Sequence, residues 1–317
     1  MSMKFSFFSI LFFLTFSVVS QQKFSKEFSF INDNDLYASK EKDRYYSNGL
    51  FFTYRYLSSK PEHLEKKIIE LQIGHELYTP YKSTVLNVNL HDRPFAAYLF
   101  GSIGVTRVYE NNRILKNNLQ IGLVGKEALG KELQEAIHTI YNFRSPVGWK
   151  YQIRNTIAIN FDTEYYKALG TDTSNHYDTN FIGKLRLGTI FTEATAGIMG
   201  RIGFKELQPI QNSIAFNTNL NNEATYYVRG VESFLYYETS LTYVLNDATI
   251  EGSLFNNDSP VTFNPKAIRF DLEVGYKFTA KRWNFGYAFH FHSNKLPNLR
   301  NDKGNYYGQL FFSYLFN

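Results

Sequence analysis

The sequence predicts an all-β transmembrane protein: an antiparallel up-and-down β-barrel of about 12 strands with a short helix in an extracellular loop. Three observations support this prediction. Long segments alternate apolar and polar residues, an apolar export signal stands at the N-terminus, and no later segment is apolar over the length of a spanning helix. Alternating strands are therefore the elements by which the exported chain can cross a bilayer.

The first 20 residues have the layout of a cleaved secretory signal peptide. Lys4 precedes an apolar run from Phe5 to Val19, and the small residue Ser20 ends the segment. The run is short for a spanning helix, which needs about 20 apolar residues. We therefore expect cleavage after Ser20 and a mature protein, residues 21–317, that forms a single domain.

The composition argues against several other classes of protein. The chain contains no cysteine, so disulfides cannot stabilise it and a thiol nucleophile is impossible. The net charge of +5 is modest and the basic residues are scattered, which gives nucleic-acid binding little support. No repeat, proline-rich linker or block of charge divides the sequence.

The alternation is clearest in residues 268–278. One face carries the apolar side chains Ile268, Phe270, Leu272, Val274, Tyr276 and Phe278, and the other carries Arg269, Asp271, Glu273 and Lys277. Similar segments are expected near residues 24–33, 45–57, 67–77, 95–108, 116–125, 150–165, 178–191, 194–203, 229–245, 267–279, 282–294 and 304–317. An even number of strands suits a closed barrel with an apolar outer face and a polar lumen.

With both ends of the barrel in the periplasm, odd-numbered connections lie outside the cell. The early outer connections are long, at residues 34–44, 79–94 and 126–149, whereas residues 58–66 and 280–281 form periplasmic turns. A soluble two-sheet sandwich is the alternative fold. The length of the strands and the absence of cysteine favour the barrel.

Acidic and amide residues gather at both ends of the first outer connection. The run Asn-Asp-Asn-Asp at residues 32–35 ends the first strand, and the run Ser-Asn-Gly at residues 47–49 opens the second. Because neighbouring antiparallel strands meet at the same rim, these oxygen ligands could hold Ca²⁺. The alternative is that they only form turns, and their spacing is not that of an EF-hand loop.

The third outer connection contains a convincing helix, at about residues 127–141. Its apolar stripe consists of Leu129, Leu133, Ile137 and Ile140. Gln134 and His138 are four residues apart and share a neighbouring face, so a helix over the barrel mouth could aim both at the rim. Imidazole is the natural general base near neutral pH, although His138 could also be a surface or packing residue.

Several motifs occur together in the order and spacing of one family. They are the segments at residues 32–35, 43–49 (DRYYSNG) and 92–98 (DRPFAAY), then GLVG at residues 122–125 leading to Gln134 and His138, then Gly148-Trp149 with Gln152, and PVTFNP at residues 260–265. In these motifs the chain resembles the outer-membrane lipid A 3′-O-deacylase (LpxR-like) family. The resemblance covers most of the mature chain.

The resemblance implies a twelve-stranded barrel that removes the 3′-linked acyloxyacyl chain of lipid A, with Ca²⁺ and without a covalent intermediate. By position, Asn32 and Asp33 match the family's essential Asn-Asp pair, and Ser47 matches a hydroxyl residue that is usually threonine. Gln134 matches the helical glutamine and His138 the catalytic histidine. The implied metal ligands are Asp33, Asn32 and Gln134.

Two positions depart from the family's pattern. Arg144 stands where some members carry an acidic residue six positions after the histidine, and Lys82 is only a loose counterpart of the family's active-site lysine. The candidates for binding lipid phosphates are Lys82, Arg93 and Arg44, because arginine can meet phosphate bidentately. Each could equally form a salt bridge at the rim.

These observations predict a monomeric hydrolase of the bacterial outer membrane that acts on lipid A of lipopolysaccharide. His138 would take a proton from water, which attacks the ester carbonyl, while Ca²⁺ held near Asp33 stabilises the oxyanion. Ser47 and Asn32 would orient the water or a ligand. The alternatives are a non-enzymatic barrel, either a pore or a structural protein, and a Ca²⁺-dependent phospholipase of the same membrane.

Overall fold

A computed structural model describes residues 23–38, 44–225, 230–255, 257–297 and 299–317. The expected signal peptide, residues 1–20, lies outside these residues. Within the described ranges, no helix combines the length and the apolar character that crossing a membrane requires.

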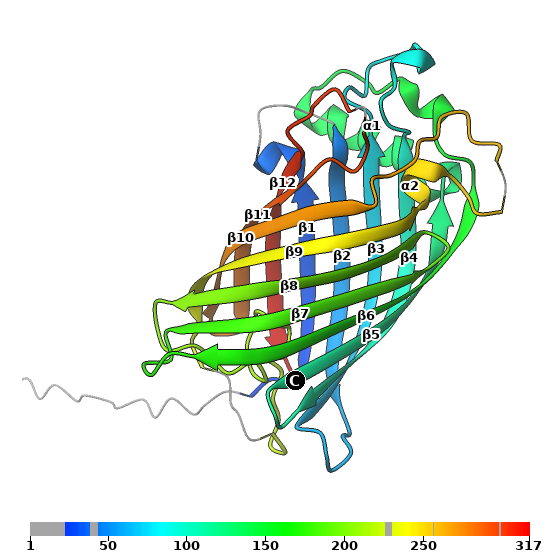
Figure 1. The fold of residues 1–317 in the computed structure, drawn as a ribbon. Helices are drawn as coiled ribbons and strands as arrows, with labels where there is room; N and C mark the ends of the chain where they lie inside the picture. The colour runs from blue at the N-terminus through cyan, green and yellow to red at the C-terminus, as the bar shows by residue number, and fades with distance from the viewer. Residues whose placement is uncertain (1–22, 39–43, 226–229, 256, 298) are drawn as a thin grey trace, which may run out of the picture.

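Twelve antiparallel strands form one closed barrel, as the alternation predicts (Figure 1). The strands are β1 (Lys26–Asn34), β2 (Tyr45–Ser58), β3 (Lys66–Thr79), β4 (Ala96–Tyr109), β5 (Arg113–Val124), β6 (Thr156–Thr171), β7 (Tyr177–Gly188), β8 (Phe191–Gly203), β9 (Ser233–Asp247), β10 (Ile268–Ala280), β11 (Trp283–His292) and β12 (Asn305–Phe316). Each strand pairs with its sequence neighbours, and β1 pairs with β12 from Lys26↔Phe316 to Asn34↔Gly308.

Helices are confined to the connections between strands. They are the α-helices α1 (Gly130–Tyr141) and α2 (Ala248–Glu251) and the short 3-10 helices η1 (Asp35–Tyr37), η2 (Val88–Leu90), η3 (Lys126–Ala128) and η4 (Gly148–Tyr151). The helix expected over residues 127–141 is therefore present and begins three residues later, after Leu129, whose φ is 58°.

The sixth strand is shifted from its expected position. The sequence predicts a strand at residues 150–165, whereas β6 spans Thr156–Thr171. Residues 148–151 form η4, and Ile153 is buried with its backbone N–H donating to the carbonyl of Phe95. Ile153 therefore belongs to a loop packed on the barrel rim, so its place in the alternating pattern was misleading.

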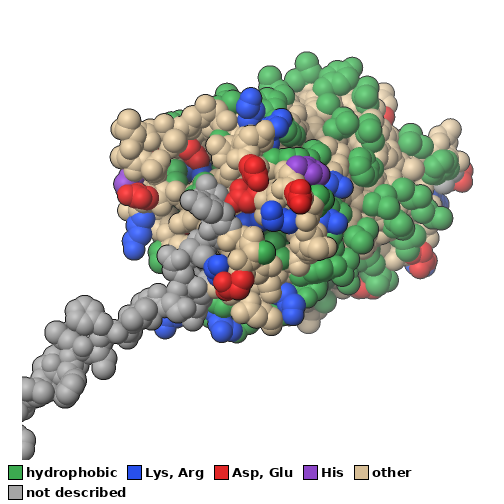
Figure 2. Space-filling view, turned by 90° about the horizontal axis from the view of Figure 1, so that it is seen from below, with side chains coloured by type: hydrophobic (Ala, Val, Ile, Leu, Met, Phe, Trp, Pro, Cys, Tyr) green, Lys and Arg blue, Asp and Glu red, His purple; other side chains and the backbone are tan. Residues whose placement is uncertain are grey.

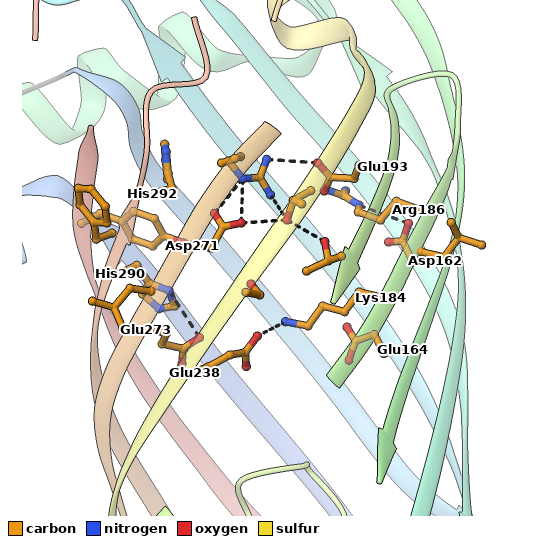
Figure 3. Close-up of a pocket in the computed structure, with 18 of the residues that line it drawn as sticks. Asp162, Glu164, Lys184, Arg186, Glu193, Glu238, Asp271, Glu273, His290 and His292 are labelled. Carbon is orange, nitrogen blue, oxygen red and sulfur yellow. Dashed lines mark hydrogen bonds and ion pairs between the residues drawn. The ribbon is translucent and has the colours of Figure 1, made fainter. Parts of the chain in front are cut away.

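The two faces of the barrel wall differ as predicted. Ile73, Ile157 and Leu241 project outward with 62%, 63% and 59% of their surface exposed. Charged side chains project inward and line a lumenal cavity of about 390 Å³. Figure 3 shows the ion pair of Lys184 and Glu238, whose Nζ and Oε1 atoms lie 2.6 Å apart. Arg269 Nη1 lies 3.2 Å from Glu193 Oε2 in the same cavity. The wall is therefore apolar outside and charged inside, which suits a barrel in lipid.

The connection between β8 and β9 fills the periplasmic end of the lumen. Its residues Ile210, Ile214 and Phe216 are buried against lumen-facing side chains of β4 to β9 and β11. Arg201 of β8 contacts both Asp178 and the Ser213 hydroxyl of this connection. We call residues 204–225 and 230–232 the plug. The same end of the barrel is shown in Figure 2, where charged and polar side chains lie across it.

Arg201 ties the plug to the wall, because its guanidinium donates to the Ser213 hydroxyl at 2.6 Å and to the Gln208 carbonyl at 3.0 Å, and it is itself completely buried. Replacing it by alanine leaves Asp178 without its buried counter-charge, which typically costs about 3–5 kcal/mol. We expect Arg201→Ala to lower the urea midpoint at which the barrel loses its heat-modifiable migration. Arg282→Ala, at an exposed position of the same end, should cost less than about 1 kcal/mol. Equal shifts for the two variants would contradict the structural role of the plug.

Candidate functional site

Helix α1 lies against the outer wall of the barrel near its extracellular end (Figure 1). It buries Gly130, Gln134 and His138, which recur every four residues on one face. A Cβ on Gly130 would come within 2.4 Å of the Ala97 Cβ, so the absence of a side chain allows the close approach to β4. The buried face of the helix is therefore polar, and not the apolar stripe.

An apolar cluster holds α1 in this position. It contains Leu77 of β3, Phe95 and Ala97 at the start of β4, Ala128 of η3 and Trp149 of η4. Leu77 lies on the same side of β3 as the exposed Ile73, so this cluster covers the outer wall and not the lumen.

A buried hydrogen bond joins the cluster to the helix. The indole N–H of Trp149 donates to Gln134 Oε1 over 2.6 Å, which leaves that oxygen already engaged. Gln134 is therefore a positioning residue for α1 in this structure.

The hydrogen bond of His138 defines the tautomer of its neutral ring. Its Nδ1 lies 2.5 Å from the backbone carbonyl oxygen of Arg144. Because a carbonyl oxygen can only accept, Nδ1 must carry the hydrogen, and in the neutral ring Nε2 then has the basic lone pair. The ring is buried and its edge meets Phe143, with 5.6 Å between centroids. The side chain of Arg144 has no part in this contact, so the departure at that position leaves the orientation of His138 intact.

Two asparagines and a serine adjoin the cluster on the outer wall. Asn34 of β1 pairs with Asn48 of β2, and Asn48 pairs with Leu77. Asn48 Oδ1 is buried and has no hydrogen-bond partner within the described part of the chain. Ser47 sits in a bulge, where its hydroxyl lies 3.4 Å from the Leu77 carbonyl. A polar patch therefore lies beside α1 on the lipid-facing side of the wall.

Asn32 and Asp33 lie on opposite faces of β1. Asp33 projects into the lumen, where its carboxylate accepts hydrogen bonds from the Tyr46 hydroxyl at 2.7 Å and Gln309 Nε2 at 2.8 Å. Asn32 projects outward and is held by the Gly49 carbonyl at 2.9 Å and the Tyr37 hydroxyl at 2.6 Å. The structure brings Asn32 to the outer wall with His138 and leaves Asp33 inside the barrel.

This separation bears on the expected calcium site. Among the described residues, no three histidine or carboxylate side chains come together as a metal-binding group. Asp33 faces the lumen, and Gln134 Oε1 already accepts from Trp149. The three predicted ligands do not converge on one face of the wall, so the described residues do not fit an ion held by all three. Asn48, with its unpartnered buried oxygen, is an oxygen donor that the sequence-based ligand set omitted.

The three cations predicted to bind phosphate differ in accessibility. Arg93 is buried, and its guanidinium donates to the Tyr45 carbonyl at 3.0 Å and to the Thr249 hydroxyl at 2.7 Å. Burial lowers the pKa of Arg93, although the nearby Asp247 opposes this shift.

The other two predicted cations lie closer to the rim. Arg44 is buried between the rings of Tyr81 and Tyr306, whereas Lys82 is exposed. Arg93 is thus a structural clamp over the extracellular mouth, and Lys82 is the member of the three that solvent and lipid head groups can reach.

The comparisons with known proteins agree with this architecture. A family model described as "Outer membrane protein LpxR" matches residues 7–316. The chain belongs to the LpxR family of outer membrane proteins. Its barrel fold and family together assign it to the bacterial outer membrane. A search of curated proteins finds no match.

Solved structures support the fold of this LpxR-family protein. LpxR from Salmonella typhimurium is 17% identical, with a TM-score of 0.71 over 92% of this chain and all of that one. The beta domain of the Bordetella autotransporter Brka (10% identity, TM-score 0.47, 92% and 99% covered) is similar only in general outline. The same holds for the translocator domain of the autotransporter NalP from Neisseria meningitidis, which is 11% identical with a TM-score of 0.43 over 94% of this chain and 90% of that one.

The contact between Gly130 and Ala97 can be tested directly. We expect Gly130→Val to push α1 away from the wall, because its side chain would overlap Ala97 and the Trp149 ring. Limited proteolysis should then cleave the connection between β5 and β6 faster while heat-modifiable migration is unchanged. Ala136→Val is the control, since Ala136 is exposed on the same helix and receives the same β-branched side chain. Only the control loses helix propensity, because valine is a better helix former than glycine and a poorer one than alanine. Equal cleavage rates for both variants would contradict the close packing.

Proposed function

We propose that this LpxR-family protein is a lipid A deacylase, a carboxylic ester hydrolase that removes the 3′-linked acyloxyacyl chain of lipopolysaccharide lipid A. The observation that carries the proposal is that His138 is buried on the face of α1 that also carries Gly130 and Gln134, which packs on the lipid-facing side of the barrel wall. A general base on that face can meet a membrane ester without the lipid entering the lumen. Membership of the LpxR family supports the same function.

In the proposed reaction His138 acts as a general base. With the hydrogen of Nδ1 directed to the Arg144 carbonyl, Nε2 accepts a proton from water as the water oxygen attacks the ester carbonyl. The tetrahedral intermediate then expels the sugar oxygen, and the imidazolium returns its proton to that leaving group. Ser47, Asn32 and Asn48 supply polar groups on the same wall to orient the water and the carbonyl.

Calcium dependence is a further part of the proposal. The oxygen-rich residues 32–35 and 47–49 meet at one rim, as Ca²⁺ sites require. An ion on the catalytic side would be held by outer-wall oxygens, among them Asn48 Oδ1, and would polarise the ester carbonyl. Asp33, which faces the lumen, would affect such an ion only indirectly, across the barrel wall.

The pore alternative is disfavoured by the plug. Buried residues of the β8–β9 connection fill the lumen at the periplasmic end, and the Arg93 clamp crosses the extracellular mouth. A Ca²⁺-dependent phospholipase would use the same chemistry on glycerophospholipid. Profiling both lipid classes by mass spectrometry, in a Gram-negative host with and without the protein, separates these activities.

The proposal includes a monomeric barrel, because the closed sheet leaves no strand edge to pair with another copy.

The role of His138 is tested by His138→Asn, which keeps polarity and approximate size but removes the base. We expect the rate of lipid A deacylation to fall by about 10²–10⁴-fold, the usual contribution of a positioned base. Thr139→Asn, at the exposed neighbouring position, should retain the wild-type rate. Wild-type activity of a folded His138→Asn barrel would leave α1 as a structural element only.

The calcium proposal predicts that a chelator abolishes deacylation and that added Ca²⁺ restores it. Because Asp33 faces the lumen, Asp33→Asn should leave the half-saturating calcium concentration unchanged, whereas Asn48→Ala should raise it. Titration of activity with Ca²⁺ measures both. A large rise in the half-saturating calcium concentration for Asp33→Asn, without a rise for Asn48→Ala, would place the ion inside the barrel. Full activity in the presence of chelator would remove calcium from the mechanism.

A further inference from the structure

Helix α1 has two unlike flanks on either side of its wall-facing residues. At 100° per residue, Gly130, Gln134 and His138 occupy the centre of the buried face. One flank carries the apolar side chains Leu133, Ile137 and Ile140, together with Leu129 just before the helix. The opposite flank carries Lys131 and Glu135, and Glu132 lies on the side of the helix that is turned away from the wall. A helix with separate apolar and charged flanks suits a boundary between hydrocarbon and water.

The apolar flank points along the wall toward the hydrocarbon region. Leu133 packs against the same cluster as Leu99, which lies two residues further down β4 than Ala97, away from the rim. Ile140 and Leu129 remain 79% and 52% exposed, which is unfavourable in water. These side chains continue the belt of outward apolar residues of the barrel itself.

The neighbouring strands show that this belt reaches the level of the helix. Leu123, near the end of β5, and Ile157, near the start of β6, project outward with 38% and 63% exposed. Residues 125–155, which contain α1, connect these two strand ends. The apolar flank is therefore continuous with the lipid-facing surface of the barrel.

The charged flank borders a hollow of about 860 Å³ between α1 and residues 145–155. Four cations line it, Lys126, Lys131, Lys150 and Arg154, against the two carboxylates Glu132 and Glu135. Lys131 Nζ lies 3.7 Å from Glu135 Oε1, a pair weakened by solvent. An excess of positive charge on this side suits the anionic head groups of a membrane surface.

We propose that α1 lies at the boundary between acyl chains and head groups of the outer leaflet, with Leu129, Leu133, Ile137 and Ile140 inserted among the acyl chains. The partner of this flank is thus the hydrocarbon of the surrounding lipids. The charged flank and its hollow face the head groups.

The placement has a consequence that rests on the proposed function. The ester bonds of membrane lipids lie at the boundary between head groups and acyl chains. His138 sits on the wall-facing side between the two flanks, so it would meet an ester at that depth without the lipid being lifted from the leaflet. This restricts the substrate to an ester near the head group of a membrane-resident lipid.

The absence of cysteine makes the depth of α1 measurable. Single variants Ile140→Cys and Lys131→Cys would be labelled with a nitroxide in the full-length barrel and reconstituted in bilayers that contain lipopolysaccharide. Collisions with oxygen, which partitions into hydrocarbon, and with a water-soluble nickel chelate would be measured by spin-resonance power saturation. Ile157→Cys, on the outer face of β6, serves as the hydrocarbon reference.

We expect the Ile140→Cys label to have an oxygen-to-nickel collision ratio close to that of Ile157→Cys, and the Lys131→Cys label a much lower one. Leu129→Cys provides a second position on the apolar flank if Ile140→Cys does not fold. A label on the apolar flank that matches Lys131→Cys would overturn the proposal. The readout requires no turnover, so an inactive protein with a lipid-exposed flank would count against the deacylase proposal alone.

Discussion

The structure depends on the absence of hydrogen-bond partners in hydrocarbon. Each backbone N–H and C=O within the membrane must pair inside the protein, and a sheet meets this demand only when its first and last strands join. Here β1 and β12 pair over nine residues, from Lys26↔Phe316 to Asn34↔Gly308. Closure leaves no edge, makes alternation obligatory along every strand, and confines the irregular segments that carry chemistry to the two rims.

Alternation also divides the polar residues between two separate environments. Asp33 joins the lumenal network with Tyr46 and Gln309, whereas Asn32 and Asn34 face outward. A step of one residue along β1 therefore moves a side chain from the lumen to the lipid-facing side of the wall. The proposed chemistry belongs to the outward compartment, because α1 covers the wall from outside and buries His138 there.

The lumen and the outer wall have different tasks in this barrel. Inside, ion pairs such as Lys184–Glu238 join neighbouring parts of the wall, and the buried Arg201 donates to the Ser213 hydroxyl and so anchors the plug. These interactions make the barrel a rigid support. On the outside, the Trp149–Gln134 hydrogen bond and the Gly130–Ala97 contact set the helix on that support. A preorganised site needs such a rigid scaffold.

The sequence alone determined the barrel, the approximate positions of all twelve strands and the helix that carries Gln134 and His138, because period-two and 3.6-residue patterns are local. Alternation could also have shown that Asn32 and Asp33 lie on opposite faces. Only the tertiary structure decided that Arg93 is a buried clamp, that the β8–β9 connection plugs the lumen, and that α1 buries its polar face. These features depend on contacts between residues far apart in the chain, which no local pattern encodes.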